Sequence, residues 1–400
     1  MSILKNSAIY LGAEVCSKCL PLLLLPYLTN KLGVQGFAEL SIVLAAATYV
    51  LVAIGLGADR FVLKFVADGI SRGRLVSAAL KWFWLSSFIL SVIGFFLYGV
   101  EGVIVVVYAL SQASLMLMLS ALQSKEEVGK YSGVQVGVSI TSTVMTIIIF
   151  EYVSFGVNER LLIVAMSNSI FSLFLWSYVN SESDIEETFM IEKGGFFAFI
   201  AYSMPLVGYL LSSASKGQLE KIYFSYSASD EYIASYSLAF QLMTLYLYFY
   251  TSVNKALVPK LYSRLRNEGI DGRYFVKQLM IKFLLSCVIV LPVFFLPDFI
   301  FTLIFGDEFH SVSELFLFFS ISTVLYLPYL MLLNTLLYFS KVYETSVYAL
   351  AGVFVYFISL YFLHRYYPIL VPLANLVSTF FVIVLMGYKV FCIERDIRNV

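Results

Sequence analysis

Residues 82–122 read WFWLSSFILSVIGFFLYGVEGVIVVVYALSQASLMLMLSAL, and this stretch decides the fold class. Glu101 is its single charged residue, with an apolar run on either side. Each run holds about 20 residues, which is enough for a helix to cross a hydrocarbon core roughly 30 Å thick. The stretch therefore predicts two membrane-spanning helices, 82–100 and 102–122, joined by a short loop.

The same pattern continues along the whole chain. Of its 400 residues 60% are hydrophobic and 13% are charged, and the mean hydropathy is +0.87. This composition excludes a soluble globule and predicts an all-α polytopic membrane protein of about 12 transmembrane helices. The predicted spans are 8–29, 38–59, 82–100, 102–122, 132–152, 161–179, 196–216, 232–254, 279–297, 313–338, 345–363 and 368–391.

Basic residues are distributed unequally between the two sides of these spans. With a cytoplasmic N-terminus, 20 of the 26 Lys and Arg fall in cytoplasmic segments, five fall outside, and Lys18 lies within the first span. Cytoplasmic loops of membrane proteins carry such an excess. The first apolar run lacks a small-residue cleavage site, so we expect it to be retained. We expect a multi-pass protein of the bacterial inner membrane with both termini cytoplasmic.

A weak internal repeat suggests two halves. An offset of 196 residues pairs residues 37–41 with 233–237 and Lys64 with Lys260. The acidic, polar segment SESDIEETFMIEKG occupies residues 181–194, near the midpoint. We predict a six-helix N-terminal lobe at 1–180, a cytoplasmic linker at 181–194 and a six-helix C-terminal lobe at 195–400. Since six is even, the two lobes would be parallel repeats.

Two charges lie inside the first predicted span, where a charge is costly. Glu14 and Lys18 are four residues apart, so they share one face of a helix. One interpretation is a neutralised pair that packs against other helices. The other is a site that faces a cavity, in which Lys18 attracts an anion and Glu14 accepts a proton.

Further charges lie at the ends of spans. Asp59 and Arg60 close the second span, Lys255 ends the eighth, and Lys216 and Glu220 end the seventh on the outside. Side chains at such positions often reach the membrane surface, which is the alternative reading. We take Arg60, Lys216 and Lys255, with Lys18, as candidate substrate contacts, and Asp59 and Glu220, with Glu14, as candidates for ion coupling.

Prolines interrupt several spans, and a membrane tolerates such breaks where neighbouring groups or water satisfy the freed backbone. Pro21 and Pro26 fall in the first span and Pro205 in its counterpart, the seventh. We predict that these three residues act as helix hinges.

Enzyme motifs are missing from the sequence. It contains no Walker A loop, no HExxH and no GxSxG, and only two histidines. Cys16 and Cys19 form a CxxC without a histidine or a second CxxC, which favours packing over metal or redox chemistry. We therefore expect no catalytic residue, metal or cofactor. Energy would come from an ion gradient, the membrane potential, or consumption of the product on the far side.

Two segments resemble a known family. Residues 25–37, LPYLTNKLGVQGF, are similar to the first-loop signature of the Wzx-type O-antigen flippases, a polysaccharide transporter group of the MOP superfamily. The signature's glycine and Gly-Phe positions match Gly33 and Gly36-Phe37, with Ala38 where the family more often has Gly. Residues 233–241, IASYSLAFQ, are similar to the motif in the family's eighth span. The family often carries Asp near Glu220, so the resemblance leaves the role of Glu220 open.

The resemblance implies a MATE-like V of two six-helix lobes around a central cavity. It also implies a flippase that moves undecaprenyl-diphosphate-linked oligosaccharide repeat units to the outer leaflet by alternating access. The partners implied are the lipid bilayer, an O-antigen polymerase and a chain-length regulator, but no nucleic acid. On this reading the diphosphate enters near Arg60 and Lys255 and is held by Lys18, with Glu14 or Asp59 in proton coupling.

Three alternatives stay open. A multidrug or other small-molecule antiporter of the same superfamily would have an acidic cavity. A lipid II flippase would normally have more than 12 spans. An O-antigen polymerase, which is an enzyme, would need a long outside loop with catalytic Arg or His, whereas the longest loops predicted here are cytoplasmic.

Overall fold

The protein is a membrane protein built of helices. The computed structural model describes residue 12 and residues 15–153, 155–181, 195–269, 271–309, 311–339 and 341–398, and this part of the chain contains no strand. Nine helical segments within these residues are long and apolar enough to cross a bilayer. The predicted all-α polytopic class is therefore confirmed. Glu14 and residues 182–194 of the predicted linker lie outside the described residues.

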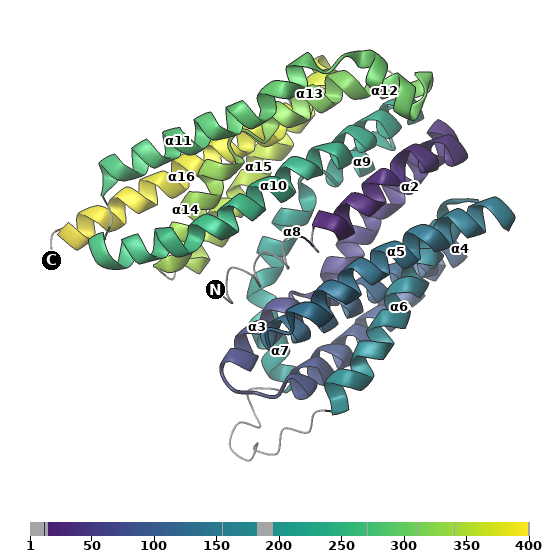
Figure 1. Cartoon of the computed structure of the whole chain (residues 1–400), viewed down its shortest axis with the longest axis horizontal. Helices are drawn as coiled ribbons and strands as arrows, with labels where there is room; N and C mark the ends of the chain where they lie inside the picture. Colours follow the sequence, from purple (N-terminus) through teal and green to yellow (C-terminus); the bar gives the residue numbers. More distant parts are fainter. Residues whose placement is uncertain are drawn as a thin grey trace. The chain divides into compact units, whose positions relative to one another are not determined.

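The chain divides into two compact units, and the first contains the described residues up to Ala214. Figure 1 shows α4, α5 and α6 side by side in this unit, and α6 packs against both others. Its elements are a helical stretch at 15–23, α2 (Leu25–Gly55), α3 (Ala58–Ala67), α4 (Arg72–Ser124), α5 (Val128–Tyr152), α6 (Val157–Ser181), α7 (Phe196–Ser203), η1 (Met204–Leu206) and α8 (Val207–Ser215).

The long helix α4 is a hairpin of two helices. Gly99 has non-helical backbone angles, with φ 63° and ψ −142°. A Cβ atom on Gly102 would lie 2.3 Å from the carbonyl oxygen of Gly94. In a continuous helix residues this far apart are separated by about 12 Å, so the chain must reverse at Gly99. The two antiparallel arms correspond to the predicted spans 82–100 and 102–122.

A second break lies within α2. Gly33 has φ 65° and ψ −175°, a conformation that favours glycine. The predicted spans 8–29 and 38–59 fall on either side of it. The total of 12 helices stays a prediction, because the apolar segments Leu25–Val66 and Arg72–Ser124 each count once among the nine.

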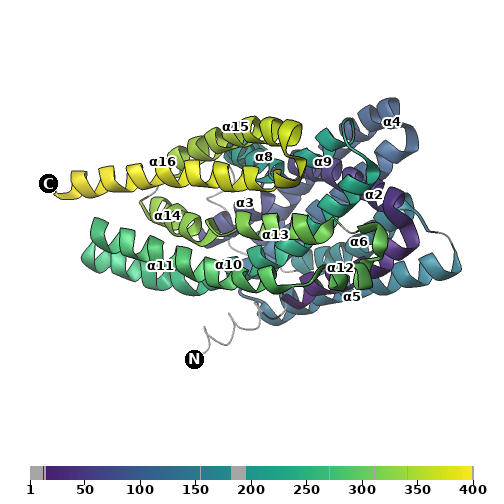
Figure 2. The same cartoon turned by 90° about the horizontal axis from the view of Figure 1, so that it is seen from above.

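The second unit begins at Ser215. Its longest helix, α10, packs against α13 and α14, while α15 and α16 run along each other, as Figure 2 shows. The elements are α9 (Leu219–Phe224), α10 (Asp230–Glu268), α11 (Gly272–Val290), η2 (Leu291–Phe295), α12 (Asp298–Phe305), η3 (Asp307–Phe309), α13 (Val312–Ser322), α14 (Tyr326–Tyr338), α15 (Val342–Tyr366), η4 (Pro368–Leu370) and α16 (Leu373–Arg398).

Helix α7 packs with the first unit through aromatic contacts. The ring centroids of Phe61 and Phe199 are 5.2 Å apart, and those of Phe65 and Tyr202 are 5.5 Å apart, both edge to face. The unit boundary accordingly follows α7, between Ala214 and Ser215. The predicted lobes 1–180 and 195–400 and the linker 181–194 stay predictions.

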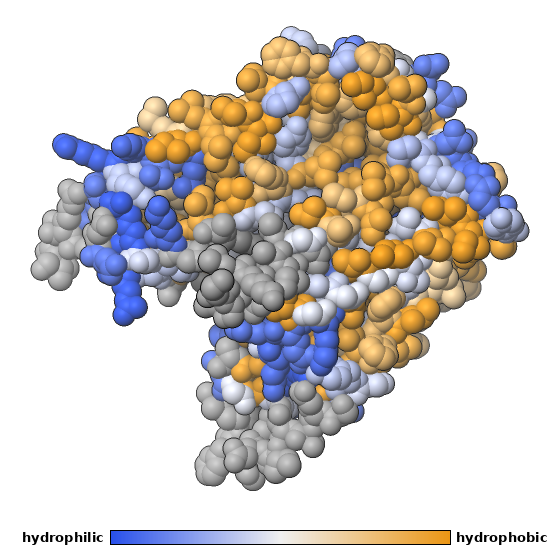
Figure 3. Space-filling model, viewed as in Figure 1, coloured by the Kyte–Doolittle hydropathy of each residue, from blue (hydrophilic) through white to orange (hydrophobic). Residues whose placement is uncertain are grey.

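Large apolar side chains are exposed along the helices. Trp84, Phe88 and Phe96 on α4 and Phe174 on α6 are examples from the first unit. In Figure 3 hydrophobic residues cover the sides of the helices and hydrophilic residues gather towards their ends. Such extensive apolar exposure matches a lipid environment.

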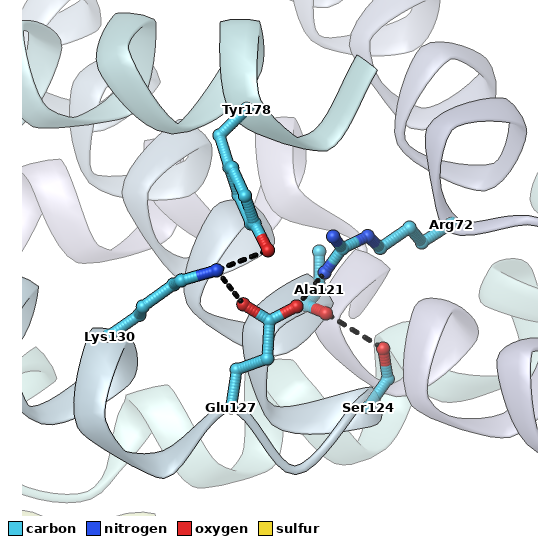
Figure 4. Close-up of polar contacts among 6 residues, drawn as sticks. All are labelled: Arg72, Ala121, Ser124, Glu127, Lys130 and Tyr178. Atoms are coloured by element: carbon cyan, nitrogen blue, oxygen red, sulfur yellow. Dashed lines mark hydrogen bonds and ion pairs between the residues drawn. The ribbon is translucent and has the colours of Figure 1, made fainter. Parts of the chain in front are cut away.

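A polar cluster joins α4, α5 and α6 at one end of the first unit (Figure 4). Arg72, whose side chain is 1% exposed, places Nη1 2.7 Å from Oε1 of Glu127 in the turn between α4 and α5. Oε2 of the same carboxylate lies 3.0 Å from Nζ of Lys130 on α5. Lys130 also donates to the hydroxyl of Tyr178 on α6. The cluster therefore links three helices that line the cavity described below.

These contacts hold Glu127 in its ionised form. Desolvation alone would raise the pKa of Glu127. Hydrogen bonds with Lys130 and Arg72, together with the charge of Arg72, outweigh this effect and lower the pKa from its ordinary value. A carboxyl group whose pKa is lowered by folding stabilises the folded state at pH values above its ordinary pKa. This contribution is lost as the pH falls through the lower pKa of the folded state.

We predict that Gly102→Ala destabilises the first unit, because the new methyl group would collide with the backbone of Gly94. Overpacking of this kind costs about 1–3 kcal/mol. Thermal unfolding of the purified protein in detergent measures the effect. Gly133→Ala on α5 is the matched control, since no atom lies within 4 Å of its new methyl group. Equal melting temperatures for the two variants would contradict the close helix approach.

We predict that Glu127→Gln lowers the free energy of unfolding by about 2 kcal/mol at neutral pH, because a buried Arg72 loses its counter-ion. The difference from the unaltered protein should be constant above the ordinary carboxyl pKa of 4.5 and shrink below it. Thermal unfolding across this pH range tests both points. Glu151→Gln breaks a more exposed ion pair, that with Lys31, and should change little. If the loss of unfolding free energy in Glu127→Gln did not change with pH, an ionised Glu127 would not be the source of the stabilisation.

Candidate functional site

The first unit contains a polar cavity of about 340 Å³. It lies among the helical stretch 15–23, α2, α4, α5 and α6. Pro21 and several leucines form its apolar walls. The polar side chains that line it are Ser17, Tyr108, Gln112, Gln135, Ser139, Ser142, Arg160 and Asn168. A cavity of this size with convergent polar groups, inside a unit of apolar helices, is the first candidate for a binding site.

Arg160 provides the positive charge of this cavity. Its Nη1 donates to the hydroxyl of Thr146 and, at 3.4 Å, to the carbonyl oxygen of Ser142, both on α5. These acceptors are neutral, and no carboxylate of the described residues forms an ion pair with Arg160. The guanidinium therefore gives the cavity a net attraction for anions.

The sequence analysis leaves Arg160 in the loop that precedes the predicted span 161–179. The predicted sixth span began at residue 161, whereas α6 begins at Val157 and carries Arg160 in its first turn. Gln112 and Asn168 are amides within the predicted spans 102–122 and 161–179, where such side chains usually form hydrogen bonds between helices. Asn168 does make such a bond, to the hydroxyl of Ser111 at 3.4 Å, and it also lines the cavity.

Lys18 follows Ser17, a residue that lines the cavity, directly in the sequence. From its helical stretch Ser17 and Pro21 line the cavity, and Lys18 is half-buried. Ser139 on α5 donates to the carbonyl oxygen of Ser17 at 2.8 Å, which fixes this stretch against α5. The proposed pairing of Lys18 with Glu14 involves a residue outside the described part of the chain.

Arg60 packs on an aromatic ring. It lies on α3, and its guanidinium carbon is 4.6 Å from the ring centroid of Tyr209 on α8. Lys64, one turn later, is 4.9 Å from the ring of Tyr202. Asp59 is exposed. The structure thus holds Arg60 by a cation–π contact within the first unit, apart from the residues that line the cavity.

The second unit buries a carboxylate near the start of α9. Glu220 is 2% exposed, and its Oε1 accepts hydrogen bonds from the hydroxyl of Tyr236 at 3.0 Å and from the amide of Gly217 at 3.2 Å. Its Oε2 is buried without a hydrogen-bond partner among the described residues. Glu220 lies beyond the span that ends at Ser215. Burial raises the pKa of Glu220 to about 7, although its hydrogen bonds and the charge of Lys221 act to lower it.

Lys221 is buried beside this carboxylate, at 4% exposure. Its Nζ lies 4.8 Å from the ring centroid of Phe240 on α10. Phe240 can approach because Gly217 has no side chain; a Cβ atom there would lie 2.0 Å from the ring. Gly217 also has φ +86°, which favours glycine. The sequence singled out Glu220, but nothing in the spacing indicated the aromatic contact of Lys221.

The remaining candidate residues lie on separate elements. Lys216 is half-buried at the break between α8 and α9. Lys255 lies on α10, where only its backbone is described. Pro26 stands in the first turn of α2, and Pro205 lies in η1, which interrupts α7 and α8. The hinge roles of Pro21, Pro26 and Pro205 stay predictions.

The candidates do not form one cluster within either unit. Lys18 and Arg60 belong to the first unit, and Lys216, Glu220 and Lys255 belong to the second. Each unit instead has its own charged interior: Arg160 with amides and hydroxyls in one, and Glu220 with Lys221 and Tyr236 in the other.

Known proteins are similar to this chain in sequence and in fold. Residues 3–265 match the family model described as polysaccharide biosynthesis protein. The Lsg locus protein 1 of Haemophilus influenzae is 28% identical over 348 residues, which cover 85% of this chain and 86% of that protein.

Two solved structures resemble the fold. The lipid II flippase MurJ in its inward closed conformation has a TM-score of 0.75 at 13% identity, covering 97% of this chain and 87% of its own. An inward-facing multidrug resistance MATE transporter of the MOP superfamily has a TM-score of 0.67 at 13% identity, covering 93% and 96%. The fold is that of these two transporters. By its match over residues 3–265, the chain belongs to the polysaccharide biosynthesis protein family.

Proposed function

We propose that this protein is a flippase that moves undecaprenyl-diphosphate-linked O-antigen repeat units across the bacterial inner membrane. The observation that supports this most directly is the match of residues 3–265 to a polysaccharide biosynthesis family in a chain with a transporter fold. In this proposal both termini are cytoplasmic, and an O-antigen polymerase and a chain-length regulator are its partners.

Moving a lipid-linked oligosaccharide across a membrane requires polar surfaces in the interior of the protein. Sugars and a diphosphate cannot cross hydrocarbon unaided, because each polar group that loses its hydrogen bonds costs several kcal/mol. A cavity with hydroxyls, amides and a cation replaces water for these groups, while the polyprenyl tail remains in lipid. We propose Lys18, Arg60, Lys216 and Lys255 as contacts of the diphosphate along this route.

We propose that transport is coupled to protons through Glu220. A carboxyl group with a pKa of about 7 changes its charge in the physiological range. Its hydrogen bonds to Tyr236 on α10 and Gly217 before α9 connect that charge to two elements. Glu14 and Asp59 remain proposed partners in coupling, and Pro21, Pro26 and Pro205 remain proposed hinges.

The main alternative within the superfamily is export of small molecules or drugs. A carrier of cationic drugs needs negative charge in its binding site. Of the described residues that line the cavity of the first unit, Arg160 alone is charged at neutral pH, which favours an anionic cargo. Against the alternative enzymatic role, polymerisation of O-antigen, stands the likeness of the fold to a flippase and a multidrug transporter.

We predict that Glu220→Gln removes the pH dependence of transport. With a pKa of about 7, the protonated fraction of Glu220 falls from about nine tenths at about pH 6 to about one tenth at about pH 8. Transport of lipid-linked oligosaccharide into proteoliposomes at these two pH values measures the effect. Asp230→Asn alters an exposed carboxylate at the start of α10 and is the control. An unchanged pH profile in Glu220→Gln would exclude Glu220 from coupling.

Deletion of the gene in the native host tests the transport function itself. We expect single undecaprenyl-linked repeat units to accumulate on the cytoplasmic leaflet, with loss of surface polysaccharide, because the units cannot cross hydrocarbon unaided. Lipid extraction and gel analysis of the polysaccharide measure both. Units that reach the outer leaflet but remain unpolymerised would indicate a polymerase. Unchanged polysaccharide would indicate export of drugs or metabolites.

A further inference from the structure

A groove lies between α11 and α16 of the second unit, at the end where α11 begins. Both helices pack against α14 (Figure 2). The start of α11 contacts α16 at Gly272, where a Cβ atom would lie 2.6 Å from Oε2 of Glu394 and 2.8 Å from the ring of Phe391. The groove has a volume of about 960 Å³, and its walls are side chains from the start of α11 and the end of α16.

One face of α11 forms most of the groove. Arg273, Lys277, Met280 and Leu284 line it at a spacing of four, three and four residues, which places them on one side of a helix. At a rise of 1.5 Å per residue, Arg273 and Leu284 are about 16 Å apart along the axis. Half of a hydrocarbon core is about 15 Å thick. The face is therefore cationic where α11 begins and apolar over a depth comparable to one leaflet.

The apolar part of the groove is open to the surroundings of the protein. Met280 is 62% exposed and Leu284 is 60% exposed, and Val276, Ile281 and Phe391 are exposed as well. These residues belong to a span or to its neighbour in the same unit. Within a membrane, lipid chains are the medium that covers such a surface.

The two cations of the groove are not used by the fold. Arg273 and Lys277 are exposed, and neither side chain forms an ion pair or a cation–π contact among the described residues. The carboxylates of the groove bind backbone amides instead. Asp271 accepts from the amide of Arg273 at 3.1 Å, and Oε1 of Glu394 accepts from the amide of Gly272 at 3.1 Å.

Other cations at this end of the second unit do have partners. Lys389 on α16 places Nζ 3.4 Å from Oε1 of Glu344 on α15. The guanidinium carbon of Arg264 on α10 lies 3.4 Å from the ring centroid of Tyr274 on α11. The cations of the groove differ from these, because they remain available to an anion from outside the chain.

The combination of charge and apolar surface selects the class of ligand. A guanidinium binds a phosphate group through two parallel hydrogen bonds, and an ammonium one turn away adds a second charge. Basic pockets between membrane helices bind anionic lipid head groups in this way. At about 30 Å³ per water molecule, the groove corresponds to about 32 waters, far more than one inorganic phosphate fills. A free anion would also leave the apolar face unused.

We propose that the groove between α11 and α16 binds an anionic phospholipid, with its phosphate on Arg273 and Lys277 and an acyl chain along Met280 and Leu284. This inference goes beyond the proposed function, because a membrane lipid would occupy the groove whatever cargo is carried. With a cytoplasmic C-terminus, as proposed above, the lipid comes from the cytoplasmic leaflet.

Native mass spectrometry of the purified full-length protein in detergent tests this inference. We expect phosphatidylglycerol to bind about tenfold more tightly than phosphatidylcholine with the same acyl chains, because choline cancels the charge of the phosphate. Glycerol 1-phosphate should bind more weakly than phosphatidylglycerol, since it has no chain for the apolar face. Equal affinity for the two lipids would overturn the proposal. Glycerol 1-phosphate that binds as tightly as phosphatidylglycerol would make this a site for free anions.

Variants locate the lipid. Arg273→Gln combined with Lys277→Gln should weaken phosphatidylglycerol binding about tenfold, to the level of phosphatidylcholine. Both residues are exposed, so we expect the variant to keep its melting temperature. Arg365→Gln combined with Arg395→Gln removes two exposed arginines outside the groove and is the matched control. Selective phosphatidylglycerol binding that survives in the groove variant would exclude this site.

Undecaprenyl phosphate separates a membrane lipid from the cargo. If it binds more tightly than phosphatidylglycerol and loses its affinity in the groove variant, the groove is a contact for the cargo and the phospholipid proposal is wrong. The flippase function is tested independently by deletion of the gene. It stands if lipid-linked units accumulate although phosphatidylglycerol does not bind, and it fails if the polysaccharide is unchanged, even where phosphatidylglycerol occupies the groove.

Discussion

Hydrocarbon offers no hydrogen bonds, so a backbone or side-chain polar group inside the bilayer needs a partner within the protein. Many hydroxyl groups satisfy this constraint on their own helix. Ser86 donates to the carbonyl oxygen of Trp82 at 2.8 Å, Ser120 to that of Leu117 at 2.7 Å and Thr335 to that of Met331 at 2.9 Å. Polar groups that converge from several helices are therefore conspicuous, and they are where function is expected.

The two units meet this constraint in different ways. The interior of the first contains a guanidinium, Arg160, whose charge is fixed at any physiological pH. The interior of the second contains Glu220 beside Lys221, and there the carboxyl group titrates near neutrality. A fixed charge suits recognition of an anion, and a variable charge suits a response to protons. In the proposed function, the first unit contacts the cargo and the second unit couples transport to protons.

The sequence was sufficient to predict the fold class, because hydropathy and charge distribution follow directly from the lipid solvent. The site was harder to predict, because small shifts decide which side chains face inwards. Starting α6 at Val157 instead of residue 161 moves Arg160 from a loop to a cavity wall. The helical stretch 15–23 is oriented so that Ser17, and not Lys18, lines the cavity. Glu220 was recognised as a candidate, but its burial depends on Tyr236 and on the close packing allowed by Gly217, which spacing rules do not reveal.

The hairpin within α4 has a consequence for biogenesis. Its arms touch through the backbones of Gly94 and Gly102, and its turn carries only Glu101 as a charge. The ribosome thus synthesises in succession two apolar helices that match each other, with a single carboxylate in the turn between them. The pair can insert together as one unit, with its contacts formed before the later helices are synthesised. Folding of the first unit can then begin from a preassembled wall of its cavity.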